Sequence, residues 1–401
     1  MNITHLYDRT FQTVFAPFNR ILNDREPVVI LREGALMEIP ALLAGQQVRR
    51  PMIVTGPRVS RSEAFRKLCD ALGGSFALYS EVKPDPPIPM VREMIKLYQS
   101  EGCDGIIAIG GGSNIDAAKA MGAGIVRPRT KLSHLGGTMK VRKKLPFFIA
   151  VPTTAGTGSE CTVAAVVTDG KTGRKFAIND PVLCPDVAVL DPALSVSMTP
   201  SLTANTGMDA LTHAIEAYLN KTYHRKGTKR TAVEAVQTIL EWLPAAYENG
   251  ADLEARAKML VASYQAGKAF TAACVGNVHA IAHTIGGKYH TPHGLANAVV
   301  LPYVLKAYLP ACGKELAALS RTAGVSQDAD DRLAAAALIA RIEEMNASFG
   351  IPQHIEGIRE EDLEEMARWA DREANPLYPV PVIFSREDFK RILRVVGGLG
   401  K

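Results

Sequence analysis

The sequence predicts an α/β domain with a mainly parallel sheet, followed by an all-helical domain. In the first half, short apolar runs alternate with helical patterns, and each run is continuously apolar, as in strands that are covered on both faces. In the second half, helical patterns follow one another without a convincing strand. The pattern changes from alternating strands and helices to helices alone after Asp191-Pro192, so we expect one domain over 1–192 and another over 193–401.

The strands are expected where short runs of β-branched and other apolar residues occur. These runs are 28–31, 52–55, 105–109, 147–151 and 187–190. Helical patterns between them, such as 62–72 and 89–100, would cover the sheet. Proline and glycine separate the expected helices of the second half, which are 202–219, 230–246, 252–273, 295–308, 328–347, 360–373 and 386–396.

The composition excludes several classes of protein. Of the 401 residues, 47% are hydrophobic and 22% are charged, as in ordinary soluble globular proteins. The net charge of +5 is too small to indicate nucleic acid or a membrane as the main partner. The longest apolar run, 333–340, is shorter than the roughly 20 residues that cross a bilayer. The six dispersed cysteines and the absence of a signal pattern are typical of a cytoplasmic protein.

A glycine-rich turn follows the expected strand 105–109. Gly110, Gly111, Gly112 and Ser113 lead directly into a helical pattern. Glycine allows the backbone to approach a phosphate closely, and a helix N-terminus offers unpaired N–H groups. A phosphate cradle and a plain tight turn with Ser113 as the N-cap fit this pattern equally well.

A second polar loop follows the expected strand 147–151. It contains Thr153, Thr154 and Thr157 together with two glycines and a serine. Ligands bind at the carboxyl ends of strands in open α/β sheets, so these hydroxyls could line a pyrophosphate or ribose site. The alternative is an N-capped loop without a ligand.

Polar pairs with i, i+4 spacing lie on two apolar helical segments. Asp209 and His213 form one pair, His279 and His283 form the other, and His293 follows closely. Burial of these groups without partners would be costly, and Asp with imidazoles suits Fe(II), Zn(II), Mn(II) or Co(II). We therefore favour a metal site over hydrogen-bonded core histidines. The segment HAIAH lacks the Glu of the HExxH motif of zinc proteases.

Together these segments resemble the iron-containing (group III) alcohol dehydrogenases. The motifs that carry the resemblance occur in the family's order, at 110–120, 151–160, 174–178, 206–218, 279–294 and 375–376. The resemblance implies a dinucleotide-binding domain followed by a helical metal-binding domain, an architecture shared with dehydroquinate synthase. It also implies a metal-dependent alcohol dehydrogenase or aldehyde reductase. Such an enzyme transfers a hydride between NAD(P)(H) and a small primary alcohol or diol and its aldehyde.

The resemblance also implies roles for individual residues. The metal ligands would be Asp209, His213, His279 and His293, with Fe(II) as the metal and Zn(II) as the alternative. His283 would relay the proton near the nicotinamide. His290, in contrast, matches no ligand position, and we interpret it as a structural or substrate-lining residue.

The cofactor residues follow from the same comparison. Gly110 to Ser113 would hold the pyrophosphate, Thr153 and Thr154 would line the cofactor cleft, and Lys175 would reach the nicotinamide ribose. Two polar residues of the following helix would be surface or packing residues without a chemical role, namely Asp116 and Lys119.

Gly56 bears on the choice of cofactor. Many family members have an Asp directly after the strand that matches 52–55, where its charge repels the 2′-phosphate of NADP. NADP-using members tend to have Gly at this position, and here Gly56 is followed by Arg58 and Arg61. We therefore expect NADP(H) to be preferred over NAD(H). The alternative is mixed cofactor use, with the two arginines as ordinary surface charges.

Three rival functions remain open. A glycerol or polyol dehydrogenase-like enzyme would bind its metal with one Asp and two His. A dehydroquinate synthase-like lyase would bind its metal with one Glu and two His. The Asp and three His of this chain favour the iron type. A catalytically silent subunit is disfavoured because no predicted ligand is missing. The expected partners are a small alcohol or aldehyde and further copies of this chain, as a homodimer or a higher homo-oligomer.

Overall fold

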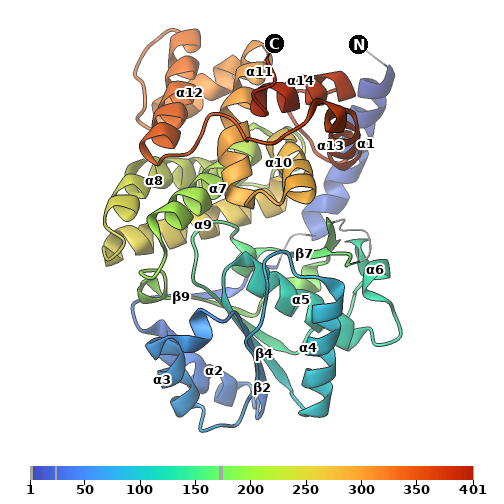
Figure 1. The fold of residues 1–401 in the computed structure, drawn as a ribbon, viewed down its shortest axis with the longest axis vertical. Helices are drawn as coiled ribbons and strands as arrows, with labels where there is room; N and C mark the ends of the chain where they lie inside the picture. The colour runs from blue at the N-terminus through green and yellow to red at the C-terminus, as the bar shows by residue number, and fades with distance from the viewer. Residues whose placement is uncertain (1–2, 23–24, 171–174, 401) are drawn as a thin grey trace. The chain divides into compact units, whose positions relative to one another are not determined.

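The computed structural model describes residues 3–22, 25–170 and 175–400, and the chain divides into two compact units (Figure 1). The helical unit comprises Met1–Ile21, Thr199–Gly250 and Gln265–Lys401. The sheet unit comprises Leu22–Met198 and Ala251–Tyr264. The division falls within helix α9 (Leu253–Ala273).

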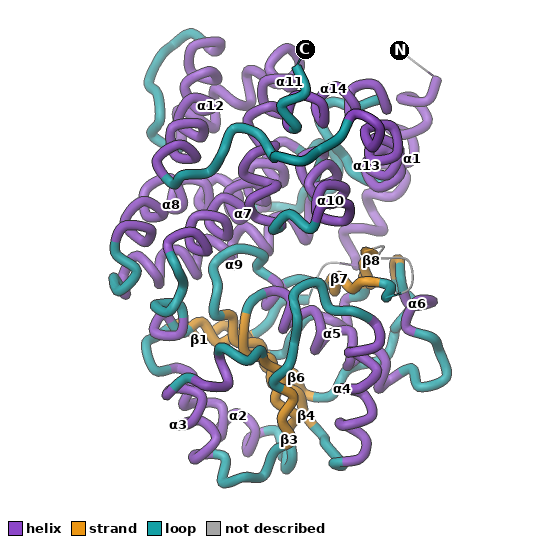
Figure 2. Tube along the Cα trace, viewed as in Figure 1, coloured by secondary structure: helices purple, strands orange, loops and turns teal. Residues whose placement is uncertain are grey.

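A six-stranded parallel sheet forms the centre of the sheet unit (Figure 2). Its strand order is β1-β9-β6-β4-β2-β3. The strands are β1 (Val28–Leu31), β2 (Pro51–Thr55), β3 (Ala77–Tyr79), β4 (Gly105–Gly110), β6 (Phe147–Pro152) and β9 (Val187–Leu190). All the expected strands are confirmed. The sequence did not predict β3, because three residues are too few to form a recognisable pattern.

Helices cover both faces of the central strands β2, β4, β6 and β9, which explains why these strands are apolar, whereas the edge strand β1 is largely exposed. Adjacent residues of a strand point to opposite faces, so Met52 and Ile53 belong to two different core clusters. Helices α4 (Ile88–Ser100) and α5 (Gly112–Val126) lie on one side of the sheet in Figure 1. The other side is covered by α2 (Ile39–Gly45) and α3 (Glu63–Ala71).

A second, three-stranded sheet was not expected from the sequence. It has the order β5-β8-β7, from β5 (Gly137–Thr138), β7 (Ala164–Thr168) and β8 (Lys175–Asn179). Strands β7 and β8 pair antiparallel, and the short helix α6 (Leu132–Leu135) precedes β5. These strands are only partly buried, and β8 has just three consecutive apolar residues, Phe176 to Ile178.

The helical unit contains no strand among its described residues. Apart from α9, its helices are α1 (Ile3–Leu22), α7 (Pro200–Leu219), α8 (Thr228–Glu248), α10 (Asn277–Tyr289), α11 (His293–Thr322), α12 (Asp331–Ser348), α13 (Leu363–Ala374) and α14 (Arg386–Val396). Helix α11 packs against α7, α10 and α12.

Helix α11 runs well beyond the 295–308 predicted from the sequence. It continues past Pro310 through a kink at Cys312, whose φ is −137° and ψ is 28°. By length and composition α11 would be able to cross a membrane, but most of its apolar stretch is buried inside the protein, as in the core helix of a soluble domain.

Helix α1 is part of the helical unit, although its position in the chain had grouped it with the sheet. Gln12 Nε2 donates hydrogen bonds to the carbonyl oxygens of Pro376 (3.0 Å) and Tyr378 (2.8 Å). The Phe15 ring contacts the Tyr223 ring at a centroid distance of 5.8 Å. These contacts join residues more than 200 positions apart, and no local pattern in the sequence of α1 predicts them.

Candidate metal centre and cofactor loops

Asp209, His213, His279 and His293 bring their donor atoms together inside the helical unit. Helix α7 carries the first two, α10 carries the third, and α11 begins with the fourth. One donor atom from each residue lies within 4.8 Å of the others. Asp209 Oδ1 is 3.4 Å from His293 Nε2 and 3.7 Å from His279 Nε2. The structure thus gathers all four predicted ligands in one place.

A glycine explains how His293 reaches this cluster. A Cβ atom on Gly294 would lie 2.2 Å from the backbone oxygen of Asn205, which no side chain tolerates. Glycine at this position therefore lets the first turn of α11 pack directly against the backbone of α7. Asn205 lies one helical turn before Asp209, so the close approach places His293 beside that carboxylate.

Two observations show that this donor set fits a divalent cation. His213 is buried, and its Nδ1 atom has no hydrogen-bond partner among the described residues. Asn297 Nδ2 lies 2.7 Å from Asp209 Oδ1 and 3.1 Å from the Nε2 atoms of both His279 and His293. An amide nitrogen has two protons, so it cannot satisfy three acceptors fully. A cation would satisfy the converging lone pairs.

The electrostatics of the cluster agree with this chemistry. Burial raises the pKa of Asp209, but the neighbouring histidines outweigh burial and hold that pKa below its usual range. Burial lowers the pKa of His213 well below its usual value. Burial also lowers the pKa of His279, but Glu216 and Asp209 outweigh it and raise that pKa to about 9. Asp209 is therefore anionic and His213 neutral, which are the protonation states in which these side chains bind a metal.

His283 lies beside the cluster but is not one of its four members. Its ring is 5.1 Å from that of His293 and 5.9 Å from that of His279, measured between centroids. Its Nδ1 atom is 2.6 Å from Glu373 Oε1, to which the Tyr378 hydroxyl also donates at 3.0 Å. His290 is farther along, as the exposed C-cap of α10.

The predicted cofactor residues gather at the carboxyl ends of neighbouring strands of the sheet unit. Gly56 follows β2, the glycine turn follows β4, and Thr153 follows β6. The backbone N–H of Thr153 donates to the Gly110 oxygen at 3.0 Å. Because the strands are parallel and adjacent, these loops share one edge of the sheet.

Two glycines of the turn pack closely against threonines of the second polar loop. A Cβ atom on Gly111 would lie 3.2 Å from Thr154 Oγ1, and one on Gly112 would lie 2.6 Å from Thr157 Oγ1. Helix α5 begins at Gly112, with Gly111 as its N-cap. The alternative of Ser113 as the N-cap is therefore wrong, since Ser113 already lies in the first turn of the helix.

Asp116 and Lys119 are packing residues rather than surface residues: Lys119 is buried and Asp116 is half-buried. Lys119 Nζ donates to the backbone oxygens of Ser159, Thr162 and Ala164 at 2.7, 2.8 and 2.9 Å. Asp116 accepts hydrogen bonds from the Ser159 hydroxyl at 2.6 Å and from a backbone N–H of β7 at 2.9 Å. The two side chains thereby attach the second polar loop to α5.

Lys175 is the predicted cofactor residue that shows no contact with the glycine turn. It begins β8, and its Nζ atom forms an ion pair with Asp85 Oδ1 at 2.7 Å. This ion pair would have to open before Lys175 could reach a ribose.

Comparison with known proteins identifies the family. The family model described as iron-containing alcohol dehydrogenase matches residues 27–192, and the model of the family's C-terminal part matches residues 203–396. The chain belongs to the iron-containing alcohol dehydrogenase family. This alcohol dehydrogenase is accordingly an oxidoreductase that acts on CH–OH groups.

Known relatives of this alcohol dehydrogenase match most of its length. The NAD-dependent methanol dehydrogenase of Bacillus methanolicus is 36% identical over 348 residues, which cover 85% of this chain and 91% of that protein. The 1,3-propanediol dehydrogenase of Citrobacter freundii is 39% identical over 335 residues, or 82% and 86% of the two chains. Since these relatives are dehydrogenases, the lyase alternative is not favoured.

Solved structures show the same fold. A 1,3-propanediol oxidoreductase is 33% identical, with a TM-score of 0.88 over 94% of this chain and 100% of that chain. An alcohol dehydrogenase from Oenococcus oeni is 34% identical, with a TM-score of 0.88 over 92% and 98% of the two chains.

Three polar residues around the metal centre of this alcohol dehydrogenase were not singled out from the sequence. Glu216 follows His213 by three positions on the apolar helix α7, and Asn297 follows His293 by four on α11. This helical spacing was a signal that could have found both residues. Glu373 is 90 positions from His283, and only the tertiary fold joins them.

Proposed function

We propose that this chain is an Fe(II)-dependent alcohol dehydrogenase for small primary alcohols or diols and their aldehydes, with NADP(H) as the preferred cofactor. The convergence of the Asp209, His213, His279 and His293 donor atoms within 4.8 Å carries the metal part of the proposal. Relatives are named for methanol, 1-propanol and 1,3-propanediol, which supports a small alcohol as the substrate.

Each residue at the centre has a distinct task in this proposal. Asp209 and the three histidines would hold the cation, which supplies Lewis-acid polarisation of the substrate oxygen. His283 directs Nδ1 to Glu373, so its Nε2 atom is left to accept the hydroxyl proton in alcohol oxidation and to return it in aldehyde reduction. The nicotinamide cofactor, when bound, would supply the hydride chemistry at the carbinol carbon.

The family description supports Fe(II) as the metal. One carboxylate and three imidazoles also suit Zn(II), which generally binds more tightly than Fe(II) at a given N/O site. The metal found in the protein therefore depends on availability as well as on the ligands. For this reason activity has to be compared between the two metals on the same stripped protein.

The preference for NADP(H) is supported by Gly56 at the carboxyl end of β2. Because Gly56 has no carboxylate, this position does not repel a 2′-phosphate. The exposed Arg58 and Arg61 follow it. One relative is named as NAD-dependent, so mixed or reversed cofactor use is the rival.

The deciding experiment measures NADPH and NADH oxidation with formaldehyde, propanal and 3-hydroxypropanal. The protein is first stripped of metal and then reloaded anaerobically with Fe(II) or Zn(II). Activity that returns only on reloading, and is faster with NADPH, is the expected result. Full activity of the stripped protein would exclude the metal centre, and a strong preference for NADH would exclude the cofactor proposal.

We also propose that the enzyme is a homodimer or a higher homo-oligomer. Strand β1 lies at the edge of the six-stranded sheet, and the side chains of Val28, Val29 and Leu31 are exposed there. An exposed apolar edge strand is a template for pairing with another chain. Light scattering after size-exclusion chromatography tests this proposal, and a monomer at micromolar concentration would contradict it.

A further inference from the structure

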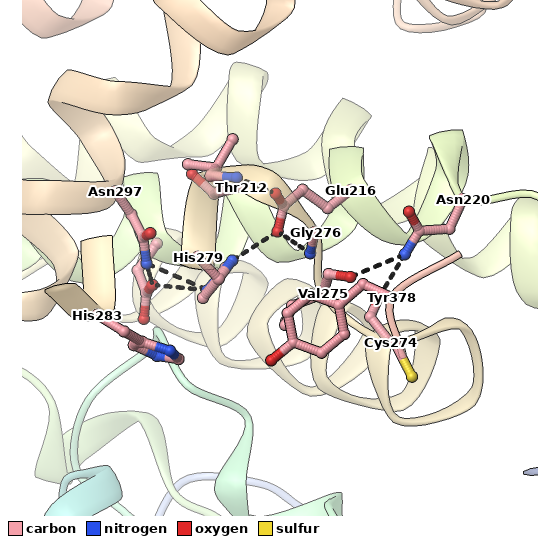
Figure 3. A network of polar contacts seen from close by, with 12 residues as sticks. Thr212, Glu216, Asn220, Cys274, Val275, Gly276, His279, His283, Asn297 and Tyr378 are labelled. Atoms are coloured by element: carbon pink, nitrogen blue, oxygen red, sulfur yellow. Dashed lines mark hydrogen bonds and ion pairs between the residues drawn. The ribbon is translucent and has the colours of Figure 1, made fainter. Parts of the chain in front are cut away.

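We propose that Glu216 is a positioning residue of the metal centre, which orients His279 and fixes the start of helix α10. This inference rests on the proposed metal site and adds a fifth residue that is not itself one of the ligands. Glu216 lies on α7, seven positions after Asp209 and three after His213, and it is buried. Figure 3 shows it between His279 and Gly276, the residue that precedes α10.

The Glu216 carboxylate accepts three hydrogen bonds, all from the first residues around α10. Oε2 accepts from His279 Nδ1 at 2.6 Å and from the backbone N–H of Gly276 at 2.8 Å. Oε1 accepts from the backbone N–H of Val278 at 2.7 Å. All three distances are in the range of charge-assisted hydrogen bonds.

Two of these bonds make Glu216 a cap for α10 that is supplied by another helix. The N-cap residue Gly276 provides no side-chain hydrogen bond of its own. A carboxylate at a helix N-terminus satisfies N–H groups that lack partners inside the helix and interacts favourably with the helix dipole. A Cβ atom on Gly276 would lie 2.8 Å from Glu216 Oε1, so glycine is needed for this close approach.

The third bond determines which nitrogen of His279 faces the cluster. With Nδ1 donating to Glu216, Nε2 is the nitrogen that faces Asp209, 3.7 Å from Oδ1, and it would be the atom that binds the cation. Carboxylates that hold the second nitrogen of a metal-binding histidine fix its tautomer and ring orientation and raise its basicity. Glu216 also adds a second negative charge, so Asp209 and Glu216 together would balance one divalent cation.

A purely structural role for Glu216 can be separated from this one, because Asn220 provides a matched control. Asn220 is buried one turn later, as the C-cap of α7, and its Nδ2 atom donates to the backbone oxygens of Ala273, Cys274 and Val275 at 2.9, 2.9 and 3.1 Å. Asn220 therefore secures the same turn without a hydrogen bond to any of the four predicted ligands.

The experiment measures Co(II) and Zn(II) dissociation constants by chelator competition for the wild type, Glu216→Gln and Asn220→Ala. The visible absorption spectrum of the Co(II) protein is recorded for each. Circular dichroism and NADPH binding establish that each variant is folded. We expect Glu216→Gln to weaken metal binding by about 10- to 100-fold and to alter the Co(II) spectrum. Asn220→Ala should lower the melting temperature while metal affinity stays within about threefold of the wild type.

Each other outcome has a definite meaning. Wild-type affinity and an unchanged Co(II) spectrum in Glu216→Gln would overturn the role of Glu216 alone. Equal weakening in both variants would also overturn it, because loosening of the turn would then explain the effect. A folded wild-type protein that binds neither metal would overturn the metal centre itself, and with it the proposed function.

Discussion

His283 Nδ1 lies 2.6 Å from Glu373 Oε1, although the two residues are 90 positions apart in the chain. They come from α10 and α13, which pack against each other. The side chains are 27% and 30% exposed, so the pair is only partly shielded from solvent. Tyr378 donates its hydroxyl proton to the same carboxylate oxygen. A partly exposed imidazole with one nitrogen fixed in this way is suited to pass a proton between a substrate and solvent.

Removal of Glu373 should therefore slow proton transfer without loss of the metal. In His283→Ala, kcat should fall by about 10²- to 10⁴-fold, the usual contribution of a general acid or base. Glu373→Ala should lower kcat by a smaller factor, about tenfold, because His283 is still present but is no longer oriented. Steady-state kinetics on the metal-loaded variants measures both effects.

The control for this prediction is Tyr378→Phe, which removes one hydrogen bond to Glu373 and leaves the bond to His283 intact. It should lower kcat less than Glu373→Ala does. Metal content is measured for every variant, and a loss of metal in Glu373→Ala would mean that the carboxylate supports the ligands rather than the proton relay.

Two polar i, i+4 pairs on apolar helices predicted a metal site from the sequence, and the resemblance to the family supplied the set of four ligands. Asp209 and His213 had to share a face of α7, and burial of that face made a partner necessary. In α10, helix geometry could not separate His279 from His283, since both lie on the same face. The structure separates them by their neighbours: Glu216 holds His279, and Glu373 holds His283.

The main sheet was predictable for a similar reason, and the smaller sheet was not. Strands covered on both faces leave a continuous apolar signature, as in β4. Strand β8 is half-buried and has only three consecutive apolar residues, and the apolar residues of the half-buried β7 were not recognised as a strand. Placement of α1 in the helical unit depends on Gln12 reaching the backbone of residues 376–378, which no local pattern encodes.

Substitution of a ligand should abolish metal binding. Asp209→Asn keeps the shape of the side chain but removes its charge. Loss of a residue that only hydrogen-bonds a ligand lowers metal affinity by up to about 100-fold, so loss of the ligand itself should lower the affinity by more than about 100-fold. Inductively coupled plasma mass spectrometry after dialysis measures the bound metal. His290→Asn is the matched control, because His290 is exposed, has a φ of 56° and makes no contribution to the cluster. Asn tolerates that conformation. Equal metal loss in both variants would contradict the assignment.

The cofactor preference should reverse in Gly56→Asp. A Cβ atom at Gly56 would meet Asn114 Nδ2 at 3.4 Å and the Val82 oxygen at 3.6 Å, which are ordinary van der Waals contacts. The substitution therefore fits, and the new carboxylate should repel a 2′-phosphate by about 1–4 kcal/mol. We expect kcat/KM for NADPH to fall at least about tenfold relative to that for NADH.

Gly56→Ala separates charge from size in this test. It adds the Cβ atom without the carboxylate, so the ratio of kcat/KM for the two cofactors should stay close to that of the wild type. A ratio that shifts as much in Gly56→Ala as in Gly56→Asp would show that the effect is steric. If the ratio of kcat/KM changes in neither variant, the 2′-phosphate of NADPH does not bind near Gly56.

Glu160 should make the stability of the enzyme depend on pH. It lies in the buried 3-10 turn Ser159–Cys161, where burial raises its pKa from 4.5 to about 7 against a smaller opposing effect of Lys119. The folded protein therefore binds more protons than the unfolded chain between pH 4.5 and 7, and the free energy of unfolding falls as pH rises through this window. Glu160→Gln removes this titration, so its stability relative to the wild type should rise between pH 4.5 and 8 by up to about 3 kcal/mol. Urea denaturation at the two pH values measures the difference. A relative stability that is the same at both would show that the fold does not raise the pKa of Glu160.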